Sequence, residues 1–174
     1  GAAGGLVLLG GDYHGGDDPA TRYLDAPMER AATTTIAAGA TIAADGSAGD
    51  GGNVVVWADD HTSFAGHISA TGLTAGGDAE VSGKAVLDFV GTADLTSSSG
   101  HFGTLLLDPY NVTISDGTDM LGGGPDFIAN TDNSIINATT LMSALATADV
   151  TVSTGADGDG GTQAGNITVA APLT

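Results

Sequence analysis

The sequence predicts an all-β fold in which short strands stack into a parallel β-solenoid, and three observations lead to it. Glycine supplies 29 of the 174 residues, whereas aromatic residues make up 5% and charged residues 14%. Few large side chains are therefore available, and the core must be thin. Clusters of β-branched residues, such as residues 53–56, favour strands. The third observation is a loose repeat of about 25 residues, a period typical of solenoids.

The repeat is clearest between residues 52 and 107. An offset of 25 or 26 superposes residues of similar type: Gly52, Gly77 and Gly103; Val56, Val81 and Leu107; Phe64 and Phe89; Gly66 and Gly91. Inward side chains of successive coils should therefore stack in ladders, with glycine at corners where neighbouring chains approach closely. At about 4.8 Å per coil, about seven coils would give a rod of about 35 Å.

We expect residues 1–174 to form one β-helix segment. Strands are predicted within residues 5–9, 32–44, 53–58, 62–70, 149–153 and 165–170. A short helix is predicted over 139–149, because Leu141, Leu145 and Ala148 are spaced for one helical face behind threonine N-cap candidates. Residues 12–30 and 156–165 are rich in glycine and aspartate, which predicts loops that leave the solenoid wall.

The net charge limits the classes of partner that the chain can bind. The chain has 3 Lys and Arg against 21 Asp and Glu, a net charge of −18. Nucleic acid is an unsuitable partner, because binding its phosphates requires basic residues. The chain has no cysteine, so its fold needs no disulfide. The first residues lack the basic and apolar regions of a signal peptide, so we expect an internal piece of a longer chain.

Several sequence runs resemble the filamentous-haemagglutinin-type exoproteins of two-partner secretion. The runs are Gly51–Asp59 (GGNVVVWAD), Thr62–Ala70 (TSFAGHISA), Glu80–Lys84 (EVSGK), Gly103–Ile114 (GTLLLDPYNVTI) and Gly165–Thr174 (GNITVAAPLT). The resemblance covers most of the chain. It implies a right-handed parallel β-helix within a large protein that an outer-membrane transporter secretes. The amino-terminal domain that such a transporter recognises is not found in this sequence.

The resemblance implies a rod-like structural segment of a bacterial surface adhesin or filament that mediates adhesion, aggregation or biofilm formation. The protein is then expected outside the cell or at the bacterial surface. Its expected partners are neighbouring coils of the same chain or end-to-end copies, the secretion transporter, and glycans or proteins on host or bacterial cell surfaces.

Two alternatives use the same fold. In the first, the chain is a glycan- or receptor-binding module, and the contact residues are Tyr13, Arg22 and Tyr23 in the loop 12–30, since loops on a rigid scaffold often carry function. In the second, it is a polysaccharide-degrading enzyme, whose cleft would need carboxylates and a basic group. Lys84 near Glu80 and Asp88 is the best basic candidate, but a surface salt bridge is the simpler interpretation of this cluster. We therefore predict no catalytic residue and no enzyme.

Metal and cofactor signals are weak. Histidines 14, 61, 67 and 101 lack the paired spacing of a zinc site. Asp157 and Asp159 complete only half of a calcium-binding nonapeptide, so they are weak calcium candidates, and solvated turn aspartates are the simpler interpretation. No cofactor is predicted, with calcium as the alternative.

Overall fold

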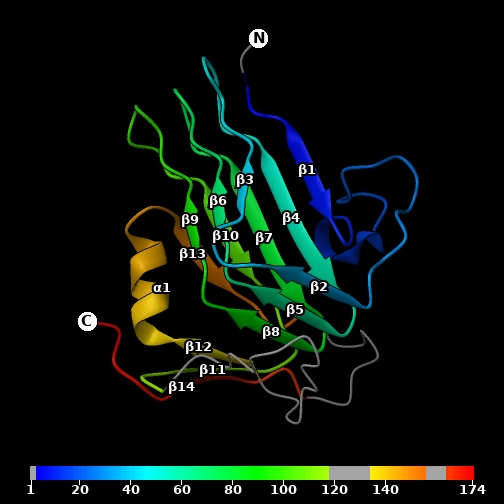
Figure 1. Cartoon of the computed structure of the whole chain (residues 1–174), viewed down its shortest axis with the longest axis vertical. Coiled ribbons are helices and arrows are strands. Elements are labelled where there is room, and N and C mark those ends of the chain that lie inside the picture. The colour runs from blue at the N-terminus through cyan, green and yellow to red at the C-terminus, as the bar shows by residue number, and fades with distance from the viewer. Residues whose placement is uncertain (1–2, 118–133, 156–163) are drawn as a thin grey trace.

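Parallel strands stack along one axis and form a β-solenoid, which confirms the predicted fold class (Figure 1). The computed structural model describes residues 3–117, 134–155 and 164–174. The longest sheet has the order β1 (Leu6–Leu9), β4 (Asn53–Ala58), β7 (Asp78–Gly83), β10 (Thr104–Leu107) and β13 (Asp149–Val152). All of its strand pairs are parallel.

Three smaller sheets complete the walls. They contain β2 (Thr33–Ile36), β5 (His61–Phe64) and β8 (Val86–Phe89); β3 (Thr41–Ala43), β6 (His67–Ser69) and β9 (Thr92–Asp94); and β12 (Ser134–Asn137), β11 (Val112–Ser115) and β14 (Ile167–Val169). The predicted strand 62–70 is two strands, β5 and β6, because the chain turns a corner at residues 65–66. Each complete coil therefore contributes one strand to each of three walls.

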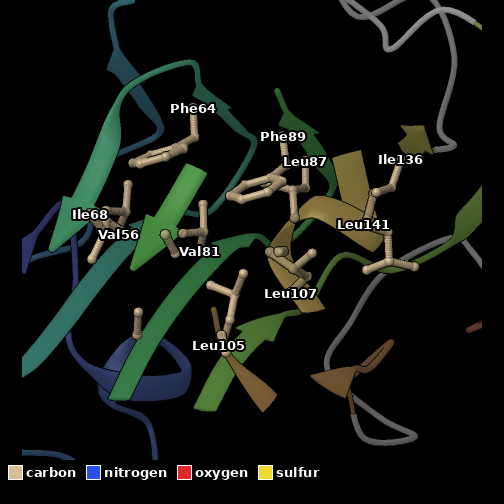
Figure 2. Close-up of a cluster of buried hydrophobic side chains, with 14 of the residues drawn as sticks. Val56, Phe64, Ile68, Val81, Leu87, Phe89, Leu105, Leu107, Ile136 and Leu141 are labelled. Carbon is tan, nitrogen blue, oxygen red and sulfur yellow. The ribbon is translucent and has the colours of Figure 1, made fainter. Parts of the chain in front are cut away.

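The predicted ladders fill the core. Val56 pairs with Val81 and Val81 with Leu107, and Leu9 and Val152 extend the ladder to five strands. Phe64 pairs with Phe89 on the next coil. Their rings are stacked with centroids 5.5 Å apart and planes 9° apart, and both side chains are fully buried (Figure 2). One coil thus supports the next through side chains of similar shape.

Glycine is required at the corner before the longest sheet. Gly52, Gly77 and Gly103 stack on successive coils. A Cβ at Gly77 would overlap backbone atoms of Gly51 and Gly52, and one at Gly103 would overlap those of Gly76 and Gly77. The corner therefore excludes side chains because the backbones pass too close together, and not because φ is positive.

The helix is shorter than predicted and has a different cap. It is α1 (Ala138–Leu145), and the side chain of Asn137, not a threonine, accepts a hydrogen bond from the N–H of Thr139. Leu141 is buried in the core as expected, but Leu145 is 47% exposed. The helix packs against β9, β12 and β13. It therefore takes the place of a strand below β9 and covers that part of the core.

The expectation of about seven coils is wrong, since within the described residues the longest sheet has five strands and each of the three smaller sheets has three. The reason is that many residues lie outside the coils. Residues 10–32, between β1 and β2, form a long excursion that includes the short 3₁₀ helix η1 (Tyr13–Gly16). The helix α1 uses further residues between β12 and β13.

Replacing Gly77 with alanine should destabilise the protein by about 1–3 kcal/mol, because the new methyl group forces two backbones apart. The control is Gly5→Ala, since a Cβ at Gly5 meets nothing within 4 Å, and it should change stability by less than about 0.5 kcal/mol. Urea denaturation followed by circular dichroism measures both. Equal stability of the two variants would contradict close packing at this corner.

Candidate functional site

The outer face of the longest sheet is covered by the excursion between β1 and β2, which lies beside β1 and β4 in Figure 1. Val55, Trp57 and Glu80 alternate with the inward residues of β4 and β7, yet each is less than 7% exposed. An outward strand residue on an uncovered wall would face water. The excursion therefore gives this sheet a second buried face.

Asp12 holds the loop 12–30 together from the inside. Its side chain is fully buried. Its Oδ1 accepts hydrogen bonds from the backbone N–H of Tyr13 at 2.7 Å and of Tyr23 at 2.8 Å, and its Oδ2 accepts one from Leu24 at 2.9 Å. Burial alone would raise the pKa of Asp12, but these three donors outweigh burial, and the pKa lies below 3.8. One carboxylate thus joins the start of the loop to residues 23–24.

The loop lies directly on the indole of Trp57. A Cβ on Gly11 or Gly15 would overlap atoms of that ring, and Gly15 also has a φ of 75°. Glycine is therefore needed here to let the loop backbone approach an aromatic side chain. At the far end of the loop, Arg30 pairs with Asp17 at 2.6 Å and with Asp59 at 3.0 Å. The loop is packed and anchored at several points.

Glu80 is a carboxylate buried between the loop and the sheet, with 2% of the residue exposed. Its Oε2 accepts a hydrogen bond from the backbone N–H of His14 at 3.0 Å, and its Oε1 accepts one from the hydroxyl of Ser82 at 2.7 Å. Burial raises the pKa of Glu80, and these two hydrogen bonds oppose the rise. Oε2 therefore holds the loop against the sheet, while Oε1 is fixed by Ser82 of the same strand.

His14 is the strained residue of the loop. Its φ is +50°, and it is the one non-glycine residue with positive φ in the described part of the chain. Its Nδ1 lies 3.4 Å from Oδ2 of Asp108, a residue that follows β10 and is 6% exposed. The other oxygen of Asp108 accepts a hydrogen bond from the N–H of Gly155 at 2.7 Å. Two buried carboxylates thus fix the backbone and the ring of His14, an arrangement often found at functional sites.

A cleft of about 580 Å³ lies between the loop and the longest sheet. The sheet wall and its corners contribute Trp57, Lys84, Asp108, Pro109, Tyr110, Ser153 and Gly155, and the loop contributes Tyr13, His14, Asp17, Asp18 and Thr21. The cleft therefore combines aromatic rings, hydrogen-bond acceptors and one lysine. A second hollow of about 200 Å³ lies next to it, between Tyr13, Tyr23 and the strands β4, β7 and β10.

The structure brings two of the three predicted contact residues together, because the rings of Tyr13 and Tyr23 meet edge to face with centroids 5.9 Å apart. Tyr13 borders both hollows, whereas Tyr23 borders only the smaller one and is 39% exposed. Burial, and then the charge of Asp78, raise the pKa of Tyr23 to about 12. Arg22 donates to the carbonyl oxygens of Leu24 and Asp25, at 2.9 and 2.7 Å, so its guanidinium is used to shape the loop.

Of the other predicted residues, Lys84 borders the cleft. The weak calcium candidates Asp157 and Asp159 fall outside the described residues. Among the described residues, no group of three or more His, Asp or Glu side chains is placed to hold a metal ion. The expected salt bridge of Lys84 with Glu80 or Asp88 is not formed in this part of the chain, because Glu80 is turned under the loop while Lys84 borders the cleft.

Sequence reasoning missed His14, Asp108 and Tyr110 as site residues. His14 and Asp108 lie 94 residues apart in the chain, and only the excursion between β1 and β2 brings them together. One signal was present: Glu80 lies between apolar residues on the neighbouring strands, because its partners in register are Val55 of β4 and Leu106 of β10. An acidic residue in such a ladder indicates a covered outer face.

Comparison with protein-family models and with curated proteins finds no match to this chain. The described residues include no helix long and apolar enough to cross a membrane. The β-solenoid and its loop-covered cleft are thus the features on which a function must be argued.

Replacing Asp12 with alanine should destabilise the protein by about 2–4 kcal/mol at pH 7, because three buried N–H groups lose a charged acceptor. Trypsin should then cut faster after Arg22. The pKa of Asp12 is lower in the folded chain, so its contribution is complete above pH 3.8 and is lost as the pH falls through the folded pKa. The stability difference from wild type should therefore shrink in acid.

The matched control is Asp25→Ala, which removes the same charge from the same loop. Thermal melting and trypsin digestion of both variants, at pH 7 and in acid, make the comparison. If Asp12→Ala and Asp25→Ala melt and digest alike, Asp12 does not organise the loop.

Proposed function

We propose that this chain is a rod-like structural segment of a secreted bacterial surface adhesin or filament, and that it mediates adhesion, aggregation or biofilm formation. The observation that carries the proposal is an incompletely covered first coil. The inward residues Val7, Leu9, Ile36 and Ile42 are only partly buried, whereas Val56, Phe64 and Ile68, one coil further on, are fully buried. The core thus reaches the surface at this end of the stack.

The backbone supports the same conclusion. Within the described residues, β1, β2 and β3 each pair with a strand on one side only. Unpaired N–H and C=O groups on three parallel strands, next to uncovered apolar side chains, form a template for another coil. A further coil of the same long chain, or the end of another copy, would bury this surface. A stack extended in this way is a stiff rod, which suits a spacer that carries adhesive parts away from a cell.

Charge and sequence also favour a place outside the cell. The chain has a net charge of −18, and a large net charge keeps exported proteins soluble and separate from one another. The runs that resemble two-partner-secretion exoproteins include the strands β4, β6 and β10, which lie in the walls of the stack. Secretion by an outer-membrane transporter and a position at the bacterial surface are part of the proposal.

A polysaccharide-degrading enzyme is the weaker candidate. Lys84 and Asp108 do border one cleft, as such an enzyme would need. However, both oxygens of Glu80 are committed to His14 and Ser82 under the loop. Of the carboxylates that border the cleft, Asp17 pairs with Arg30 and Asp108 with His14, so these groups are held by neighbouring side chains. Paired carboxylates facing a substrate are the usual requirement for glycoside hydrolysis. We therefore propose a structural and binding role instead of a catalytic one.

The test is to display the chain on non-aggregating bacteria through its carboxyl end, so that the first coil is free. Cells carrying the wild type should aggregate and adhere, and Ile42→Glu should abolish both effects, because a charge on the partly buried core surface prevents stacking. Thr41→Glu adds the same charge at the neighbouring exposed position and should aggregate like the wild type. Microscopy and settling rates measure the effect.

Settling of the wild-type cells no faster than that of cells carrying an unrelated folded domain at equal surface density would contradict the proposal. Thermal melting of the purified variants checks that Ile42→Glu remains folded. If both glutamate variants aggregate like the wild type, the first coil is not the adhesive surface.

A further inference from the structure

We propose that the cleft between the loop 12–30 and the longest sheet is a binding site for a neutral pyranose unit of a glycan. This site is distinct from the first coil on which the rod proposal depends, and it is formed by other residues. Its volume of about 580 Å³ falls within the range of about 300–1,000 Å³ that is usual for small-ligand sites.

The chemistry of the cleft suits a sugar. Tyr13 and Tyr110 are half-buried aromatic residues that border it, and the face of an aromatic ring packs well against the C–H face of a pyranose. Lys84 donates hydrogen bonds, whereas the exposed carboxylate of Asp18 at the same cleft accepts them. Hydroxyl groups both donate and accept, so a sugar can use the two kinds of group together.

The charge of the cleft selects against acidic sugars. Asp17, Asp18 and Asp108 border it, and the nearby Arg30 is already paired with Asp17 and Asp59. Among the described lining residues, Lys84 is the one lysine or arginine, and the ring of His14 faces Asp108. An anionic ligand would meet more negative than positive charge at close range. A neutral sugar avoids this repulsion and still uses Lys84 as a donor.

The cleft is also rigid before any ligand arrives. Asp12 fixes the loop through three backbone hydrogen bonds. Glu80 and Asp108, both buried, fix the backbone and the ring of His14 at the edge of the cleft. Fixed side chains lose little conformational entropy on binding, so affinity is retained. This rigidity gives the buried carboxylates a role that the rod itself does not need.

Trp57 provides a direct readout, because it borders the cleft and is the single tryptophan of the chain. The experiment titrates the purified protein with methyl glycosides of glucose, galactose, mannose and N-acetylglucosamine, and with their disaccharides, while tryptophan emission is recorded. Methyl glucuronide is the acidic probe of the same size. At least one neutral probe should give a saturable change, and glucuronide should bind at least tenfold more weakly.

Variants locate the binding. Lys84→Ala and Tyr110→Ala should each weaken binding of the responding probe about tenfold. Phe102→Ala, which changes an exposed aromatic residue that borders neither hollow, should leave binding unchanged. Thermal melting checks that all three remain folded. Cell aggregation of the Lys84→Ala variant should equal that of the wild type, so failure of this proposal is distinguishable from failure of the rod proposal.

Four outcomes would overturn the assignment. The first is the absence of any saturable change with every neutral probe, and the second is tighter binding of glucuronide than of the neutral sugars. The third is binding that the Lys84 and Tyr110 variants leave unchanged. The fourth is release of monosaccharides from the disaccharides, which would make the cleft catalytic instead of a binding site.

Discussion

The structure depends on the close, in-register approach of successive coils at one corner, where Gly52, Gly77 and Gly103 lie against one another's backbone. This contact sets the register of β4, β7 and β10, and hence the ladder of Val56, Val81 and Leu107. It also explains the composition. A thin core of aliphatic ladders needs few large residues, while a corner without room for Cβ atoms consumes glycine.

The outer face of the same sheet follows from the same register. Outward positions of β4 and β7 bring Val55 beside Glu80 and Trp57 beside Ser82, and a bare wall could not leave such groups buried. The excursion between β1 and β2 covers them, with glycine lying on Trp57 and the backbone of His14 bonded to Glu80. A rod wall is thereby converted into a cleft with fixed edges. The residues that form this cleft differ from those of the first coil, where we propose that the stack is extended.

Sequence reasoning reached the periodic part of the fold and little of the site. Identical residues at a constant offset, such as Phe64 and Phe89, report stacking directly, because each coil repeats the environment of the last. The corner at residues 65–66 and the cap at Asn137 depend on local turns that periodicity does not describe. The site joins His14 to Asp108 across an insertion that has no counterpart in the other coils, so no repeat could have indicated it. Tyr13 was found because aromatic residues in a loop are visible without the fold.

Hydrogen exchange of the backbone amides, measured by mass spectrometry at increasing protein concentration, tests most directly whether the first coil is an interface. The account predicts that peptides spanning β1, β2 and β3 become more protected as concentration rises, because those strands gain partners, while β4 and β7 remain protected throughout. Protection of β1, β2 and β3 that is independent of concentration, in a protein that sediments as a monomer, would contradict an extendable stack.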